Sequence, residues 1–250
     1  MKVQSCEYMN VTDADHNRSR SETGPESMAG PRTHGYVLDL FRKYVEPGGR
    51  VLDLAAGQGA LSLELQSLGY DVTAVDMDRD NWKVSAVELI VRDLDSEFAD
   101  GIIGEGSEFD AIAAVEILEH VENPFNFIRQ CSKLLRPGGY LVITTPNVES
   151  LFSRLVFFYT GRLNGFGEGE TVRTAHITPI FKWKLDMMLE ESGFEIIDES
   201  FLPYEITAGM NFKVRSVARF ARLFEPFVKG SKGDVGRVIV ARSIAVEDKR

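Results

Sequence analysis

The sequence places two aspartates and three small residues where together they could bind a nucleotide-like ligand. Asp53 lies in an apolar run typical of a buried parallel strand, and Ala55, Gly57 and Gly59 form the turn that follows it. A small-residue turn before a helix lets backbone N–H groups approach a ligand closely. A second apolar run ends in Asp76, whose carboxylate can accept hydrogen bonds from two ribose hydroxyls. The spacing predicts a nucleotide-type cofactor site.

The composition of the turn distinguishes between cofactors. Ala55 stands where the dinucleotide fingerprint G-x-G-x-x-G would begin, and Ala60, Leu61 and Ser62 follow Gly59. The carboxylate of the preceding strand would repel a pyrophosphate but suits an ammonium group. S-adenosylmethionine carries a sulfonium and an amino-acid end and no phosphate, so the turn favours this cofactor. Nicotinamide-dependent oxidoreduction is a remote alternative, and a glycine turn without any ligand is another.

The order of the motifs resembles class I S-adenosylmethionine-dependent methyltransferases. The matching pieces run from about Arg50 to about Phe194 and are VLDLAAGQGALS, VTAVDMD, VRDLDSEF, FDAIAAVEILEHVENP, LLRPGGYLVITTPN and HITPIFKWKLDMMLEESGF. The branch it resembles includes ubiquinone-biosynthesis O-methyltransferases and methyltransferases of sugar and antibiotic pathways. One departure is Ala55-Ala56, where the family more often has Gly-Cys or Gly-Ser. We expect Ala55 to fit there with a negative φ angle.

The resemblance implies which residue meets each part of the cofactor. Asp53 is expected at the methionine end, Asp76 at the ribose and Asp93 at the adenine amino group, although Asp93 could instead be a helix-capping acid. Glu116, after the fourth strand, is expected to line the mouth between cofactor and acceptor. The other cofactor-binding candidates are Ala55, Gly57 and Gly59 in the turn, Met77 against the adenine, and Leu94 through its backbone N–H.

Methyl transfer from a sulfonium is an in-line displacement, accelerated mainly by holding the nucleophile and the methyl group in alignment. A hydroxyl acceptor still needs a base, and His120 and His176 are the catalytic candidates because imidazole titrates near neutral pH. The alternatives are that His120 shapes its loop through a backbone hydrogen bond and that His176 caps the following helix. No carboxylate cluster matches a catechol-type magnesium site, so no metal is expected.

The bulk properties exclude some partners. The formal net charge of −10 argues against a phosphate-binding surface, so nucleic acid is not the expected partner. Cys6 and Cys131 are the two cysteines, which indicates no disulfide framework, and Cys131 is expected to be a core thiol. No signal peptide or membrane-spanning run is recognised, so a cytoplasmic location is the default expectation, with surface association with a membrane left open.

The alternation of apolar strands and helices predicts an α/β fold, a Rossmann-like three-layer sandwich around a mostly parallel sheet. The resemblance implies seven strands with the last one antiparallel and inserted near the sheet edge. The connection after Asp76 is short, so its helix is expected to be degenerate. The expected strands are 50–54, 71–75, 88–91, 109–115, 140–145, 195–201 and 237–242, and the expected helices are 31–45, 59–68, 124–135 and 181–192.

Three regions are expected to lie outside this bare fold. Residues 1–30 form a flexible segment or lid, and residues 31–250 form the methyltransferase domain with insertions at 147–174 and 203–232. Both insertions are rich in apolar residues and are expected to cap the substrate pocket. Core packing, a homodimer interface and a membrane-surface helix are the alternatives.

Three functions compete at this stage. The first is transfer of a methyl group to an O or N atom of a small molecule such as a sugar, a quinone or a secondary metabolite. The second is methylation of protein or RNA, and the third is a non-catalytic, cofactor-binding partner subunit.

Overall fold

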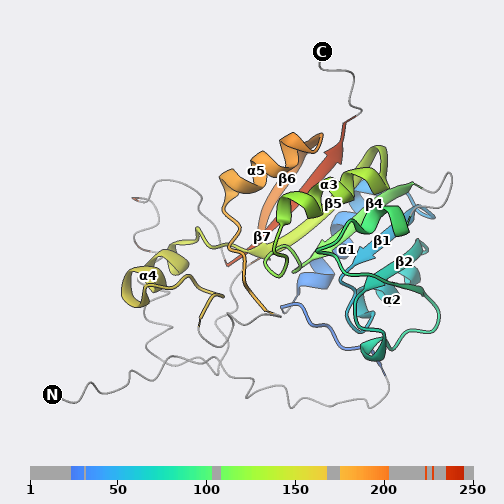
Figure 1. Ribbon diagram of the computed structural model, residues 1–250, viewed down its shortest axis with the longest axis horizontal. Helices are drawn as coiled ribbons and strands as arrows, with labels where there is room; N and C mark the ends of the chain where they lie inside the picture. Colours follow the sequence, from blue (N-terminus) through green and yellow to red (C-terminus); the bar gives the residue numbers. More distant parts are fainter. Residues whose placement is uncertain are drawn as a thin grey trace.

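The computed structural model describes residues 24–30, 32–102, 108–167, 175–202, 223, 227 and 235–244. These residues form one seven-stranded sheet with helices on both of its faces (Figure 1). The elements in chain order are α1 (Thr33–Tyr44), β1 (Arg50–Leu54), α2 (Ala60–Ser67), β2 (Asp71–Asp76), η1 (Arg79–Asn81), β3 (Glu88–Val91), η2 (Phe98–Gly101), β4 (Phe109–Val115), α3 (Pro124–Leu134), β5 (Leu135–Pro146), α4 (Leu151–Thr160), α5 (Lys182–Glu191), β6 (Phe194–Leu202) and β7 (Gly236–Ser243).

The sheet has the strand order β3-β2-β1-β4-β5-β7-β6. The first five strands in this order are parallel, whereas β7 is antiparallel to both of its neighbours. The α/β fold class, the mostly parallel sheet and the inserted antiparallel last strand are therefore confirmed. The order reverses between β1 and β4, and ligands of such sheets bind outside the carboxyl ends of the strands at this switch point.

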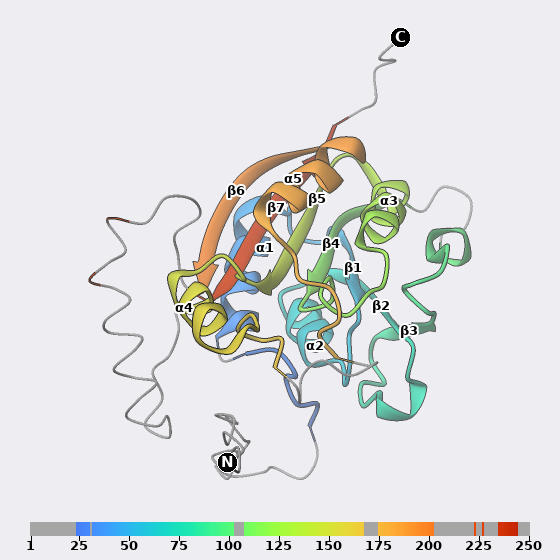
Figure 2. The ribbon, with the colours of Figure 1, turned by 60° about the vertical axis from the view of Figure 1, so that its left-hand side comes forward.

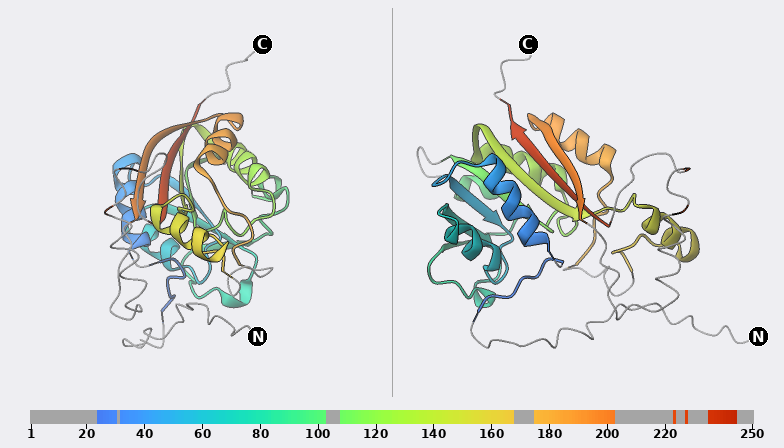
Figure 3. Two further views of the ribbon diagram at one scale, coloured as in Figure 1. Left: turned by 90° about the vertical axis from the view of Figure 1, so that its left-hand side faces the viewer. Right: turned by 180° about the vertical axis from the view of Figure 1, so that it is seen from behind.

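The core divides into two layers because successive side chains of a strand point to opposite faces of the sheet. Leu52 and Leu54 of β1 pack with Phe127 of α3 and with α5, whereas Val51 packs on the other face with Phe41 of α1 and with α2. Figure 2 and the right-hand view of Figure 3 show the sheet between these two helical layers. Cys131 is fully buried in the first layer, as predicted.

The predicted elements agree with the observed ones except in detail. β5 begins at Leu135 instead of Tyr140, because Leu135 pairs with Phe109 before the register shifts between Phe109 and Ala111. The connection after Asp76 contains only the short 3-10 helix η1, as expected of a degenerate helix.

The insertion after β5 begins with α4, which lies outside the sheet near the end of β6 and the start of β7 (Figures 1 and 2). Its Phe157, Phe158 and Tyr159 are exposed. The expected insertion at 203–232, apart from residues 223 and 227, and the N-terminal segment to residue 23, which includes Cys6, lie outside the described residues. In the described part of the chain, no helix combines the length and hydrophobicity needed to cross a membrane.

Candidate functional site

The turn between β1 and α2 has a left-handed backbone at three positions. Ala55, Gly57 and Gly59 have φ angles of 60°, 57° and 91°. The expectation of a negative φ at Ala55 is therefore wrong, because the path from the strand to the helix needs the left-handed region at this first position as well. A non-glycine residue held there costs on the order of 1–3 kcal/mol.

The two glycines of the turn are needed for different reasons. A Cβ on Gly59 would lie only 2.7 Å from side-chain atoms of Trp82 and Val84, so this glycine permits packing between α2 and the segment after η1. A Cβ on Gly57 would meet only the side chain of Met28, with Sδ at 3.0 Å. Gly57 is thus the position where the backbone is open to a ligand once Met28 moves.

Asp53 lies beneath the turn. Its side chain is buried, and Oδ2 accepts a hydrogen bond from Ser62 Oγ at 2.6 Å. Burial raises the pKa of Asp53 from its ordinary value of 3.8 to about 7, with the Ser62 hydrogen bonds acting against the rise and the charge of Asp76 adding to it. A cationic group placed nearby would favour the ionised form of this carboxylate.

Asp76 ends β2 at the same edge of the sheet. Its Oδ2 accepts a hydrogen bond from the Gly57 N–H at 2.7 Å, and its Oδ1 accepts one from the Asp78 N–H at 2.9 Å. Each carboxylate oxygen has a further lone pair, so both can still accept from hydroxyl groups. Met77, the next residue, is exposed.

Asp93 follows β3, which pairs with β2 so that Asp76 lies opposite Val91. The exposed Asp93 side chain accepts a hydrogen bond from the Asp95 N–H at 3.0 Å, which forms an Asx turn. The alternative that Asp93 caps a helix is wrong, because the next helix, η2, begins at Phe98 with Glu97 at its N-cap. Leu94 beside it is buried. Both residues thus lie at the carboxyl edge of the sheet, as the sequence predicted.

Glu116 follows β4 and has a strained backbone with a φ of 51°. Its N–H donates to the carbonyl oxygen of Thr144 at 3.1 Å, and Thr144 Oγ1 donates to Glu116 Oε1 at 2.7 Å. Burial raises the pKa of the Glu116 carboxyl, while the Thr144 hydrogen bond opposes the rise. The side chain is therefore fixed by Thr144 of β5, and its role beside the cofactor stays a prediction.

Sequence reasoning missed a further acidic residue beside it, Glu119. Its side chain is fully buried, and Thr145 Oγ1 donates to its Oε2 at 2.9 Å. Burial, followed by the charge of Glu116, raises the pKa of Glu119 well above its ordinary value. A buried carboxylate in such a turn is a feature that the apolar pattern of the sequence does not reveal.

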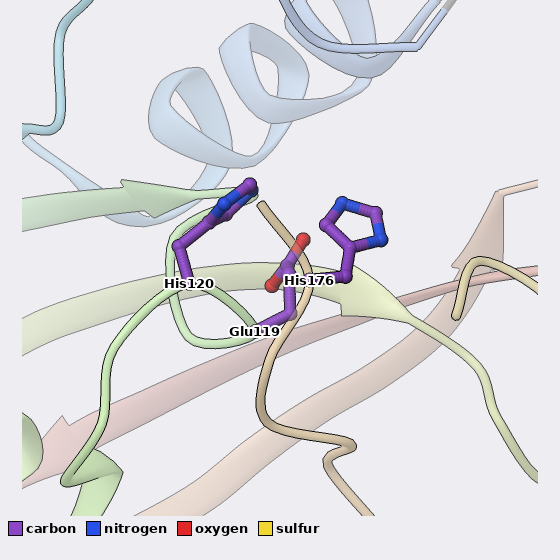
Figure 4. A group of neighbouring side chains, drawn as sticks. All are labelled: Glu119, His120 and His176. Atoms are coloured by element: carbon purple, nitrogen blue, oxygen red, sulfur yellow. The ribbon is translucent and has the colours of Figure 1, made fainter. Parts of the chain in front are cut away.

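The structure brings His120 and His176 together with Glu119, as Figure 4 shows. The imidazole centroids are 4.9 Å apart with the planes at 77°, and one potential ligand atom from each of the three residues lies within 4.8 Å of the others. These residue types can bind cations, so the expectation that no metal is used stays a prediction.

Backbone hydrogen bonds hold the His176 segment against the turn after β4. The N–H groups of Ile177 and Thr178 both donate to the carbonyl oxygen of Glu119, at 2.9 and 3.0 Å. The interpretation of His176 as a helix cap is wrong, because α5 begins at Lys182 and the Lys182 N–H donates to Glu149 Oε2 at 2.7 Å. His176 instead lies beside His120 and Glu119.

Comparison with known proteins gives matches over most of the chain. A family model described as a methyltransferase domain matches residues 32–199. The ubiquinone biosynthesis O-methyltransferase of Xanthomonas axonopodis pv. citri (strain 306) is 33% identical over 191 residues, which cover 70% of this chain and 77% of that enzyme. The enzyme of the same name from Caulobacter sp. (strain K31) is 38% identical over 105 residues, and this match covers 40% of the chain and only 42% of the relative.

Solved structures share the fold at low sequence identity. A S-adenosylmethionine-dependent methyltransferase from Archaeoglobus fulgidus superposes with a TM-score of 0.56 at 19% identity, covering 84% of this chain and 95% of that one. Magnesium protoporphyrin IX methyltransferase from Synechocystis PCC 6803, solved with bound S-adenosylhomocysteine, gives a TM-score of 0.55 at 15% identity, covering 85% and 82% of the two chains. At these sequence identities, the similarity shows a shared fold alone.

Proposed function

Because this chain belongs to the family of class I S-adenosylmethionine-dependent methyltransferases, we propose that it transfers a methyl group from S-adenosylmethionine to a hydroxyl oxygen of a small molecule. The observation that carries this proposal is the convergence of Asp53, Gly57, Asp76 and Glu116 at the carboxyl ends of β1, β2 and β4. Gly57 and Asp76, from different strands, are already joined by a hydrogen bond of 2.7 Å.

Each residue of this edge has a part in binding the cofactor under the proposal. Asp53 attracts the ammonium group of the methionine end, and Asp76 accepts from the ribose hydroxyls. Asp93 and the Leu94 N–H face the adenine. Met77, which is exposed, packs on the adenine ring. Ala55, Gly57 and Gly59 let the backbone approach the cofactor closely.

The reaction needs a nucleophile in line with the sulfonium methyl group. The acceptor oxygen forms a bond to the methyl carbon while the carbon–sulfur bond breaks, which leaves S-adenosylhomocysteine, a methyl ether and one proton. We assign this proton to His120 or His176, since the two imidazoles lie together with Glu119 in and beside the turn that follows β4, and imidazole accepts protons near neutral pH. Holding the two reactants in alignment supplies most of the acceleration.

The acceptor class rests on the relatives. Two of them are named as ubiquinone biosynthesis O-methyltransferases, so the hydroxyl group of a quinone-type aromatic ring is the first acceptor to test. Sugars, other secondary metabolites and nitrogen acceptors belong to the same screen. The net charge of −10 weighs against an RNA substrate, and cofactor binding without transfer to any acceptor would favour a partner-subunit role.

Calorimetric titration with S-adenosylmethionine, S-adenosylhomocysteine and NAD tests the cofactor directly. We expect binding of the sulfur compounds and not of NAD. Asp76→Asn should weaken binding strongly, whereas Asp71→Asn, at the exposed opposite end of the same strand, should not. A folded protein that binds neither sulfur compound, or an Asp76→Asn variant that binds as well as the parent, would contradict the proposal.

A further inference from the structure

Ser27, His34 and Glu64 form a hydrogen-bonded chain of side chains that the proposed methyl transfer does not use. Ser27 precedes α1, His34 lies in the first turn of α1, and Glu64 lies in α2. Ser27 Oγ is 3.2 Å from His34 Nε2, and His34 Nδ1 is 3.2 Å from Glu64 Oε2. A hydroxyl, an imidazole and a carboxylate joined in this order are the groups that make a serine nucleophilic.

The donors and acceptors of this chain have one consistent assignment. The ionised Glu64 carboxylate can only accept, so His34 Nδ1 carries the proton and donates it to that carboxylate. Nε2 of the neutral ring then has a free lone pair, which accepts from the Ser27 hydroxyl. A second acceptor for that hydroxyl, the carbonyl oxygen of Ala29, is farther away at 3.5 Å. His34 is therefore placed to take the proton of Ser27.

Burial affects the imidazole but not the hydroxyl. The His34 side chain is only 15% exposed, and this burial lowers the pKa of His34 from its ordinary value of 6.5, with the charge of Glu64 acting against the fall. The neutral ring is the form that accepts a proton. Ser27, in contrast, is exposed. The base is thus sheltered, whereas the nucleophile can meet a molecule from solution.

Contacts on both sides hold Ser27 in this position. The Glu26 N–H donates to Gln58 Oε1 at 2.9 Å, and the Met28 side chain lies over Gly57. Both contacts are made with the turn that leads into α2, the helix that carries the carboxylate. The serine and the acid are therefore positioned by the same part of the fold.

The N-terminus of α1 adds a positive electrostatic end beside this chain. His34 is the second residue of the helix, and no acidic side chain lies in the first turn, residues 33–36. The first N–H groups of a helix have no acceptor within the helix, and its dipole places partial positive charge there. Such an end stabilises the negative charge that develops on oxygen when a hydroxyl attacks a carbonyl group.

We propose that Ser27 is a nucleophile that accepts the acyl group of small esters, with His34 as its base and Glu64 as the residue that positions the imidazole. Small esters fit because Ser27 lies at the surface, and the exposed Met28 next to it offers the acyl chain an apolar contact. The inference does not rest on the proposed methyl transfer.

The reaction has two steps whose atoms balance. Ser27 Oγ bonds to the acyl carbon while its proton passes to His34 Nε2, and the ester C–O bond breaks as the alcohol leaves with that proton. Water then attacks the acyl carbon and gives a proton to His34. The bond to Ser27 Oγ breaks, Oγ recovers the proton from His34, and a carboxylic acid leaves. One ester and one water become one acid and one alcohol.

A fluorophosphonate probe tests the nucleophile directly, because a serine hydroxyl displaces its fluoride and keeps the phosphorus. The full chain is labelled near neutral pH without S-adenosylmethionine, and peptide mass spectrometry identifies the labelled residue. Hydrolysis of p-nitrophenyl acetate is followed on the same samples. We expect label at Ser27, complete loss of it in Ser27→Ala, and labelling at least about 100-fold slower in His34→Ala. Ser67→Ala is the matched control and should change nothing, because this exposed serine of α2 donates to a backbone carbonyl oxygen.

Glu64→Gln tests the positioning role, since the amide oxygen can still accept from His34 Nδ1. Labelling should be at least about ten-fold slower than in the parent, because the neutral amide no longer stabilises the protonated imidazole. The labelling rate should rise with pH through the pKa of His34, and the midpoint should move to lower pH in this variant, because the charge that raises this pKa is gone. A carboxylate that only held residues 24–30 in place would leave the midpoint unchanged.

The outcomes are separate from those of the proposed function. Circular dichroism identifies any variant that fails to fold, and His34→Gln then replaces His34→Ala. Absence of label at Ser27 in the parent chain would overturn the inference. Equal labelling rates in the parent and the folded His34 variant, or in the parent with and without urea, would do the same. S-adenosylmethionine binding is titrated on the same samples, and its absence would contradict only the proposed function.

Discussion

At the scale of single residues, the cofactor edge combines a buried acid with a strained turn. Asp53 is buried beneath the turn, and its pKa is raised from 3.8 to about 7. The folded state therefore holds a proton that the unfolded state has released, over the pH range between these two values. Burial of the Asp53 carboxyl therefore lowers the free energy of unfolding near neutral pH. The same burial places a carboxylate where a cationic ligand could bind.

The pH dependence of stability should report this acid. The contribution of Asp53 to the free energy of unfolding is full below about pH 4, falls as the pH rises towards 7, and is flat above it. Asp53→Asn should remove this fall, so the variant gains on the parent by about 2–3 kcal/mol between pH 5 and pH 8. Urea denaturation of both proteins at the two pH values measures the difference, and Asp71→Asn serves as control. If the difference in stability between the parent and Asp53→Asn is the same at pH 5 and pH 8, Asp53 is already ionised at pH 5 and its pKa is not raised.

The sequence predicted the positions of Asp53, Gly57 and Asp76 at strand ends, but not the contact between Glu119 and His176, for a physical reason. Asp53, Gly57 and Asp76 lie at fixed distances from strand ends, so local pattern places them. Glu119 and His176 meet only because Ile177 and Thr178 bond to the Glu119 carbonyl oxygen across a long stretch of chain. No local periodicity encodes that contact. The sign of φ at Ala55 was also missed, because the residue type favours the opposite backbone region.

At the scale of elements, the turn is fixed by the packing of the η1 connection on the start of α2. Gly59 lies under Trp82 and Val84 with no room for a Cβ, and its φ is 91°. Gly69 at the other end of α2 has a similar φ of 90° but open space around it. Substitution at Gly69 therefore measures the cost of the left-handed backbone alone, and substitution at Gly59 adds the cost of overpacking.

Gly59→Ala should be clearly more destabilising than Gly69→Ala. We expect about 1 kcal/mol at Gly69 from the left-handed backbone alone, and about 3 kcal/mol or more at Gly59, where overpacking is added. Chemical denaturation of the two variants measures both costs. Equal losses would mean that the indole of Trp82 moves aside freely, and the packing argument would then fail.

Glu149 joins three elements at the end of β5. Its Oε2 accepts from the Lys182 N–H at the start of α5 and pairs with Arg237 Nη1 of β7 at 3.0 Å. Arg237 is fully buried, and its Nε lies 3.2 Å from Glu199 of β6. The junction holds the starts of β7 and α5 at the same point. Strand periodicity predicted β6 and β7 themselves but not this pairing.

Glu149→Ala should lower the free energy of unfolding by about 2–3 kcal/mol, because it removes a carboxylate that pairs with the buried Arg237 and accepts a hydrogen bond from the start of α5. Glu195→Ala removes a solvent-exposed ion pair with Arg242, between β6 and β7, and should cost less than about 1 kcal/mol. Thermal unfolding of both variants gives the comparison. Losses of the same size would mean that burial of Arg237 does not matter.

At the scale of the whole molecule, residues 24–30 contact the edge of the sheet at which we propose that the cofactor binds. The Glu26 N–H donates to Gln58 Oε1 at 2.9 Å, and Met28 lies over Gly57 with Sδ 3.9 Å from Asn81 Nδ2. The lid expected for residues 1–30, of which 24–30 are described, stays a prediction. Since Met28 itself is largely exposed, it is held there by few contacts and can move.

Hydrogen exchange with and without S-adenosylmethionine can test whether this segment is a lid. A lid that closes over the bound cofactor should slow amide exchange both in residues 24–30 and in the turn at 55–59, by at least about ten-fold, because opening then requires the ligand to leave. The paired strands β6 and β7 lie away from the switch point and provide the internal reference. Protection of the turn with unchanged exchange at 24–30 would mean that the cofactor binds beside the segment. Faster exchange at residues 24–30 would mean that the cofactor displaces Met28. Either result would contradict a lid that closes over the cofactor.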